Sequence, residues 1–421
     1  MKNRNHFTIK MLVAMVLGII AGLVFGPKVA SIKFIGDIFL RLVQMCVVPL
    51  IMGQIIAAVG TPDPKEIGKV GLKAVSIFAV SSLLAAIFGI FMAVVFKPGS
   101  GMDLSSTVNL TVNINQNSNF IDTLVNFIPS NIIDAMAKGT IIQVIAFSLF
   151  FGIALGLYPH KEKKAVFLES LNTFNDVIMK LITIVMNLAP LGIGILLAST
   201  VGQIGKEVIL PLVNYLLVFG LGTLIFMAVW IIYTASYCKV SIPKLISKLV
   251  PMSLIAIGTT SSAVTLPTEM KDAREKIGIS DRIANLVLPL GMPLNSNGAA
   301  MHMAITVITT AQIYGVTYGF GDYFYIAIMA ALLSLANAVA PGADIVSLAM
   351  IIPQMGLPIE SIAIFAGVGY FVGALRTILN VDSDVFTAML VAKSENELNH
   401  DVFNGTLPSI AQEPNLEAGR N

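Results

Sequence analysis

The sequence predicts an all-α polytopic membrane protein, on two observations. Hydrophobic residues make up 56% of the 421 residues and charged residues only 12%, whereas roughly a quarter of a soluble domain is charged. Several apolar segments are also long enough to cross a bilayer, for which about 20 residues suffice. They lie near residues 9–26, 34–60, 74–96, 140–158, 167–201 and 208–237, with more after residue 281. The apolar segments are expected to be surrounded by membrane lipids. The net charge of +2 gives no indication of a nucleic-acid partner.

The distribution of Lys and Arg predicts the orientation. Basic residues precede the first span and follow the second, fourth and sixth spans, and four of them lie within 271–282. The connection 98–119 contains no Lys or Arg. Because basic residues are retained on the cytoplasmic side, both termini are expected in the cytoplasm and 98–119 outside the cell. We expect a multi-pass protein of the cell (inner) membrane.

Two segments of the second half are interrupted. Residues 243–270 form two apolar arms around "GTTSS", each expected to be too short to span, and 322–357 repeat the pattern with a break at 337–342. The flanking charges predict that the first hairpin enters from the cytoplasm and the second from outside. Paired interrupted segments of opposite entry indicate a transporter's binding site. The structural alternative is two broken helices that serve packing alone.

Polar groups also interrupt the segment "LPLGMPLNSNGAAMHMAI" at residues 295–298. Lipid cannot satisfy such groups, so they must be buried or line a cavity. The last span contains Arg376, and intramembrane ionisable residues are functional candidates. Helical spacing places one polar and glycine stripe on that span, comprising Gly369, Gly373, Arg376, Thr377, Asn380 and Asp384. An arginine together with helix N-termini, which attract anions, favours a carboxylate ligand.

These motifs resemble the glutamate transporter family, also called dicarboxylate/amino acid:cation symporters. "RLVQMCVVPLIMGQIIAAVG" is similar to the family's second helix, and "TTSSAVTLPTEM" to its serine-rich first hairpin tip. "LPLGMPLNSNGAAMH" stands where the family has Asn-Met-Asp-Gly-Thr, and "LRTILNVDSD" matches its last helix. The resemblance implies a homotrimer of eight spans plus two opposed re-entrant hairpins, an elevator mechanism and no enzymatic activity.

The resemblance also implies a division of the chain into a scaffold and a moving transport domain. Scaffold helices 1–2 would occupy residues 1–73, and transport-domain helix 3 would occupy 74–97. An extracellular loop and scaffold helices 4–5 would follow in 98–205. The rest of the transport domain would occupy 206–395, before a cytoplasmic tail at 396–421.

Substrate contacts carried over from the family fall on Ser261, Ser262, Arg376, Thr377 and Asn380. Arg376 would hold a side-chain carboxylate, and Ser262 and Asn380 the other carboxylate. The chain departs from the family at three positions near this site. Gly373 replaces an aspartate that binds the substrate's amino group in the family. Asn297 replaces the aspartate of the Asn-Met-Asp-Gly-Thr motif, and Ala299 replaces its threonine.

The cation sites implied by the resemblance depart as well. The shared sodium site maps onto Gly291, Asn295, Asn380 and Asp384. A second site uses carbonyls near Pro293 and 334–337 and a methionine that is Ser296 here. A third uses Ser81, Ser82, Asn295 and Asn297, and it is doubtful because Na⁺ prefers oxygen ligands with a formal charge nearby. No classical cofactor is expected, only a co-transported proton or sodium ion, with Asp384 and His302 as proton candidates.

Several alternatives remain open from the sequence. The loss of a carboxylate at Gly373 favours C4-dicarboxylates over aspartate, unless an ammonium meets second-hairpin carbonyls or Asp344. A sodium symporter of neutral or cystine-like amino acids is a second alternative. An anion channel is a third, and the closed, charged site argues against conduction as its main role. For an enzyme the sequence offers only His302, with no second metal ligand at the helical spacing.

Overall fold

The computed structural model describes residues 2–61, 64–101, 125, 127–204, 209–335 and 343–406. Within these ranges the chain is helical and contains no strand, only an isolated antiparallel bridge between Ile279 and Leu398. Four described helices are long and apolar enough to cross a membrane, or up to six if each of two bent helix pairs counts as one span. The expectation of an all-α protein with several apolar helices is confirmed.

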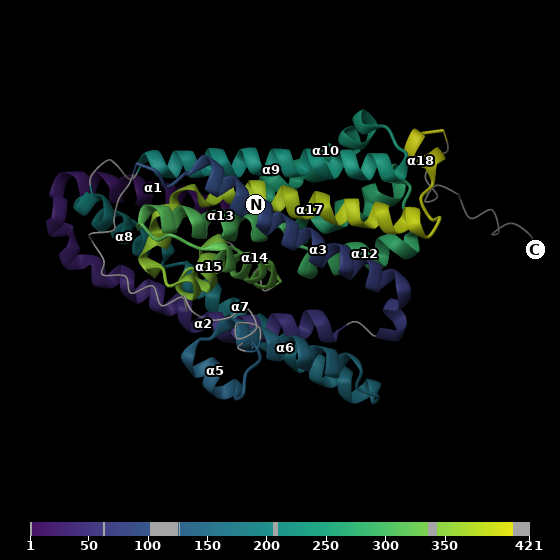
Figure 1. Cartoon of the computed structure of the whole chain (residues 1–421), viewed down its shortest axis with the longest axis horizontal. Coiled ribbons are helices and arrows are strands. Elements are labelled where there is room, and N and C mark those ends of the chain that lie inside the picture. Colours follow the sequence, from purple (N-terminus) through teal and green to yellow (C-terminus); the bar gives the residue numbers. More distant parts are fainter. Residues whose placement is uncertain are drawn as a thin grey trace, which may run out of the picture.

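One group of helices comes from the first half of the chain. Helix α1 packs against α8, and α2 packs against α6, α7 and α8 (Figure 1). The short α5 begins after Asn131, whose side chain caps it, and ends at Gly139 in a left-handed conformation. The bounds are α1 Lys2–Phe25, α2 Lys33–Gly60, α5 Ile132–Lys138, α6 Ile141–Gly156, α7 Lys161–Met186 and α8 Ala189–Ile204.

The second group contains α3 and most helices of the second half. Helix α13 packs along α3, and α17 contacts α9, α10, α12 and α13, so these segments run side by side (Figure 1). The bounds are α3 Pro64–Phe96, α9 Ile209–Cys238, α10 Ile242–Thr259, α11 Ser262–Asp272, α12 Asp281–Leu294, α13 Asn297–Ile313, α14 Phe320–Ser334, α15 Ala343–Ile351 and α17 Gly369–Ser394.

One predicted span is bent, and one sequence prediction about helix length is wrong. In the segment 167–201, α7 and α8 meet at an angle of 50°, so it is a single span only if this bent pair counts as one. The first arm of 243–270 is not too short, because α10 has 18 residues and is apolar enough to cross a membrane. The chain nevertheless turns back directly after α10, so α10 and α11 still form a hairpin, which we call the first hairpin. Helices α14 and α15 form the second hairpin, and its break at 337–342 lies outside the described residues.

Small residues bring α1 and α8 into close contact. A Cβ atom on Gly18 would lie 2.4 Å from the carbonyl oxygen of Gly194, and one on Gly22 would lie 2.6 Å from that of Ala198. Gly202 approaches the backbone of Gly26 in the same way. Small residues at four-residue spacing on both helices are typical of helix packing inside membranes, where van der Waals contact replaces the hydrophobic effect.

The polar break between α12 and α13 separates two apolar clusters. Leu294, just before the break, belongs to a cluster built from α3, α9, α10, α12 and the second half of α17. Ala299, just after it, belongs to a larger cluster that continues into α2, α6 and α8. The polar side chains of the break therefore lie in a band between two apolar regions.

The two hairpins have different surroundings. In the second hairpin, α15 packs against α2, α13 and α17. The first hairpin packs against α9, α12 and α17, and it exposes apolar side chains such as Leu254 at 62% and Val264 at 53%. Behind the second hairpin, Lys33 on α2 forms an ion pair with Glu360 at 3.4 Å. In the second hairpin, α15 thus packs against α2 of the first group of helices, while one apolar face of the first hairpin is open.

The close contact between α1 and α8 generates a prediction. Gly22→Ile should lower the melting temperature of the detergent-purified protein, because the side chain would meet the Ala198 carbonyl and overpacking costs about 1–3 kcal/mol. Thermal unfolding followed by tryptophan or dye fluorescence measures this. Leu23→Ile is the matched control, since Leu23 is exposed on the same helix. Equal melting temperatures for both variants would contradict close packing at Gly22.

Candidate functional site

Helix α17 and the break between α12 and α13 are joined by direct contacts. The backbone N–H of Gly298 donates to Asn380 Oδ1 at 2.8 Å. A Cβ atom on Gly298 would lie 2.3 Å from the Arg376 carbonyl oxygen. Residue 298 must therefore be a glycine for α13 to begin against α17. The predicted convergence of the break with the α17 stripe is present.

Arg376 is buried without a protein partner for most of its guanidinium. The residue is only 6% exposed, and Nε and Nη1 have no hydrogen-bond partner in the described part of the chain. No described carboxylate oxygen lies within 4.0 Å of it. A buried and unpaired charge is strongly unfavourable. The guanidinium is therefore arranged for an anion that comes from outside the chain.

The tip of the first hairpin faces α17 at Gly373. Thr260 adopts a left-handed conformation with φ of +47°, and Ser261 is extended before α11 begins at Ser262. A Cβ atom on Gly373 would make only ordinary contacts with Thr260, at 3.7 Å. The position thus has room for a side chain that this sequence does not supply. Thr377 Oγ1 donates to the Gly373 carbonyl at 2.7 Å, which uses the hydrogen of that hydroxyl.

The residues of the doubtful third cation site bond to one another. Ser81 and Ser82 lie on α3, and their hydroxyls donate to Asn297 Oδ1 at 3.1 Å and 3.0 Å. The amide nitrogen of Asn297 has no hydrogen-bond partner among the described residues. With an amide in place of a carboxylate, the three side chains offer no formal charge to a hard cation. The arrangement fits a polar contact better than a sodium site.

The shared cation site has more suitable chemistry. Asn295 Nδ2 donates to Asp384 Oδ1 at 2.7 Å and to Ser383 Oγ at 3.0 Å. Gly291 lies against the same carboxylate, since a Cβ atom there would be 2.4 Å from Asp384 Oδ1. The structure therefore brings Gly291, Asn295 and Asp384 together, with Asn380 on the next turn of α17. One buried carboxylate with carbonyl and amide oxygens suits a hard monovalent cation or a proton.

The other proposed positions contribute less. Of the second cation site, Pro293 and Ser296 are described, but 336–337 lie outside the described residues. Ala299 is fully buried on α13. His302 is also buried, and its ring lies 5.8 Å from that of Phe219 and 6.4 Å from that of Tyr215. Its Nδ1 atom has no hydrogen-bond partner in the described ranges. Aromatic packing near the Arg376 charge does not favour an imidazolium at His302.

Two buried carboxyl groups were missed by the sequence reasoning as site residues. Glu269 on α11 is 1% exposed, and its Oε1 has no hydrogen-bond partner among the described residues. It interacts electrostatically with Asp384 and Asp382. Asp382 points to α10, where it accepts a hydrogen bond of 2.9 Å from Ser253. Three ionised carboxylates in one buried region would repel one another, so the region favours binding of positive charge.

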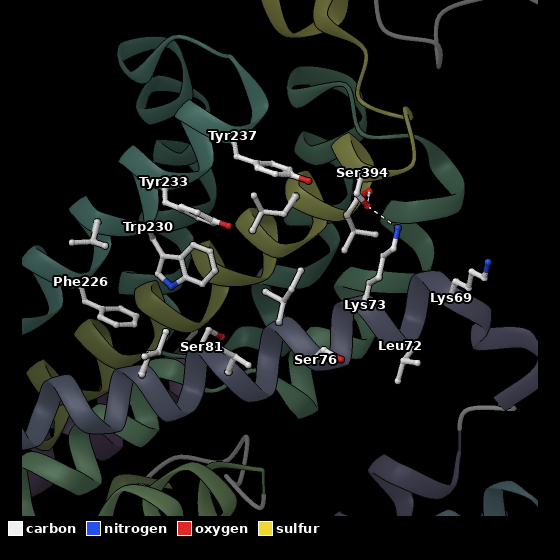
Figure 2. A pocket seen from close by; sticks show the side chains of 16 residues that line it. Lys69, Leu72, Lys73, Ser76, Ser81, Phe226, Trp230, Tyr233, Tyr237 and Ser394 are labelled. Carbon is white, nitrogen blue, oxygen red and sulfur yellow. Dashed lines mark hydrogen bonds between the residues drawn. The ribbon is translucent and has the colours of Figure 1, made fainter.

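A separate cavity of about 960 Å³ lies between α3, α9 and the end of α17 (Figure 2). Its walls are mostly apolar and aromatic, with Trp230, Tyr233 and Tyr237 on one side. Ser81 reaches its wall, but Arg376 does not. The amine of Lys73 at its edge bonds to Ser394 and Glu395. The second lining amine, that of Lys69, is exposed, so the cavity offers no buried cation comparable to Arg376.

Within the described ranges, no group of three or more His, Cys, Asp or Glu side chains is arranged to hold a metal ion. Cys46 and Cys238 are buried free thiols. Outside the apolar helices, the Arg282 guanidinium and the Ser280 hydroxyl hold the pKa of Glu397 below its usual value. This polar cluster joins the start of α12 to the chain after α17 and takes no part in the central site.

Comparisons with known proteins agree with this geometry. The family model of the sodium:dicarboxylate symporter family matches residues 7–394. The chain is 31% identical over 406 residues to the C4-dicarboxylate transport protein of Bacillus subtilis (strain 168), covering 95% of this chain and 96% of that protein. It is 30% identical over 410 residues to the proton/glutamate-aspartate symporter of Escherichia coli (strain K12), covering 93% of each chain.

A third relative is the proton/sodium-glutamate symport protein of Bacillus caldotenax, which is 29% identical over 411 residues and covers 95% of this chain and 97% of its own length. The members named here are transporters and not enzymes, as expected from the sequence. Together with the nearly full-length family match, they show that this integral membrane protein belongs to the sodium:dicarboxylate symporter family.

Proposed function

We propose that the protein is a secondary active symporter that moves a small carboxylate, either a C4-dicarboxylate or an acidic amino acid, together with protons and/or sodium. The observation that carries the proposal is the buried Arg376, whose Nε and Nη1 lack protein partners. An Arg–carboxylate pair is bidentate and charge-assisted, which provides affinity and orientation together. A neutral amino acid carries one carboxylate, so it could not pair with Arg376 and also supply the second carboxylate expected beside Ser262 and Asn380. The printed functions of the relatives support the same class.

The transport mechanism is proposed to be an elevator within a homotrimer of the inner membrane, with both termini in the cytoplasm. Residues 1–73 and 98–205 would form the scaffold, and 74–97 and 206–395 the moving domain, before the tail at 396–421. The packing of α15 on α2 supports an inward-facing state, because one arm of the second hairpin then lies against a helix of the proposed scaffold. The open apolar face of the first hairpin, at Leu254 and Val264, would then face the cytoplasmic side.

Cation coupling follows from the charges of the site. A dicarboxylate adds two negative charges, and moving each against an inside-negative potential costs about 2.3 kcal/mol per 100 mV. Asn297 supplies no formal charge for a third cation, and its oxygen already accepts from Ser81 and Ser82. Glu269 and Asp384 are buried carboxyl groups that can instead carry protons. One sodium ion at Asn295, Asn380 and Asp384 is compatible with this scheme.

The first functional prediction concerns Arg376. Arg376→Ala should weaken binding of succinate and aspartate by at least about a hundredfold, because breaking a buried pair costs about 3–5 kcal/mol. Calorimetry on the purified protein measures the affinity, and size-exclusion chromatography checks that the oligomer is retained. Arg274→Ala is the control, since that guanidinium pairs with Asp281 near the surface. Wild-type affinity in Arg376→Ala would end the assignment.

The second concerns the substrate. Succinate, fumarate or malate should bind more tightly than aspartate, because α17 has Gly373 where an ammonium would need a carboxylate, and an unpaired buried ammonium is unfavourable. Competition against a labelled C4-dicarboxylate in liposomes gives the order of affinities. Aspartate that competes tenfold better than succinate would reverse the preference.

The third concerns the coupling ion. Uptake into liposomes should respond to an inward proton gradient in sodium-free buffer, and Asp384→Asn should weaken it, since that change removes the charge of the shared site. Asp272→Asn is the control, as Asp272 is also a buried carboxylate but pairs with Lys276 at 2.7 Å. Strict dependence on Na⁺ with no response to the pH gradient would show a sodium symporter instead.

A further inference from the structure

A carboxylate from the second hairpin occupies the space beside Gly369. Asp344 lies in the first turn of α15. A Cβ atom on Gly369 of α17 would lie 2.3 Å from Asp344 Oδ2 and 3.3 Å from its carboxyl carbon. No side chain larger than hydrogen fits at 369 unless the carboxylate moves. The absence of a side chain at Gly369 therefore makes room for the Asp344 carboxylate, and we call this position the seat of Asp344. Gly369 lies on the same stripe of α17 as Arg376.

Asp344 and Arg376 interact as opposite charges. Long side chains on a helix lean towards its N-terminus, so the Arg376 side chain is directed along α17 towards Gly369, where the Asp344 carboxylate lies. The two groups attract each other across this short separation. Their N and O atoms are more than 4.0 Å apart, because no ion pair joins them within the described ranges. Asp344 therefore acts on Arg376 at a distance that leaves Nε and Nη1 without a hydrogen-bond partner in the described ranges.

Other charges near the guanidinium are few. Tyr215 also interacts with Arg376, but its hydroxyl is 2.9 Å from Thr306 Oγ1 and lies in an aromatic cluster. His302 is packed against the same rings. Asp384 lies two helical turns along α17 and bonds to Asn295. In the described part of the chain, Asp344 is the one carboxylate with an appreciable interaction with Arg376.

We propose that Asp344 is the counter-ion that stabilises Arg376 in the substrate-free site, and that the substrate carboxylate takes over this role. Because Asp344 belongs to the second hairpin, the position of that hairpin is linked to whether Arg376 is paired with Asp344 or with the substrate. Asp344 is then a positioning residue, seated at Gly369. Only the identity of the incoming anion rests on the proposed function.

The charge interaction is tested in the absence of substrate by a double-mutant cycle. Asp344→Asn keeps the shape of the side chain and removes its charge, so it should lower the melting temperature of the purified substrate-free protein. In an Arg376→Gln background, the same change should leave the melting temperature unchanged or raise it. An equal decrease in both backgrounds would show a packing role alone and overturn the proposal.

A second set of variants tests the seat at Gly369. Asp344→Asn should show a larger succinate-induced rise in melting temperature than the wild type, because the substrate no longer replaces a counter-ion. Combining Asp344→Gly with Gly369→Asp moves the carboxylate from α15 to α17 and should restore both wild-type values. Gly369→Ala should resemble Asp344→Asn by displacing the carboxylate.

Two results of this second set of variants would contradict the proposal. If the double variant Asp344→Gly, Gly369→Asp recovered neither the melting temperature nor its rise with succinate, the role assigned to Gly369 would be wrong. A selective loss of aspartate binding in Asp344→Asn, with succinate unaffected, would make Asp344 an ammonium acceptor instead. If Arg376→Ala retained substrate affinity while the substrate-free cycle behaved as expected, the proposed function would fail and the counter-ion would stand.

Discussion

The burial of the Arg376 guanidinium constrains the rest of the site. A buried charge is tolerated only when it is paired and hydrogen-bonded, and the described chain leaves Nε and Nη1 of Arg376 unpaired. The surrounding structure is arranged to make this possible. Gly298 allows α13 to begin directly against Arg376, and Asn380 holds that first turn in place. The break at residues 295–298 therefore allows α13 to start beside Arg376, which an uninterrupted spanning helix would not allow.

The same polar band determines what else can bind. On the α3 side, Ser81 and Ser82 are satisfied by Asn297, which leaves an uncharged contact where a carboxylate would attract a cation. On the far side of the break, Asn295 and Asp384 combine an amide with a buried charge. Glu269 adds a further carboxyl group from the first hairpin. Positive charge is thus favoured on the Asp384 side and negative charge at Arg376, an asymmetry suited to moving both together.

Much of this site could be predicted from the sequence because it depends on local patterns. The amide and glycine break at 295–298 and the polar spacing from Arg376 to Asp384 are visible without a structure. The angle of 50° between α7 and α8 could not be predicted, because Pro190 indicates a kink but does not determine its size. Glu269 was missed because it precedes the charged run at 271–276 and resembled a surface residue. Its burial depends on how α11 packs against α12 and α17. The contact of Asp344 with Gly369 depends likewise on the register between distant helices.

A density map of the purified protein with a bound C4-dicarboxylate would test the central claim most directly. The account predicts one substrate carboxylate within hydrogen-bonding distance of Arg376 Nε and Nη1, beside Asn380 and the first hairpin tip at Ser261 and Ser262. Density for the ligand in the apolar cavity near Trp230, with the guanidinium of Arg376 still unpaired, would contradict it.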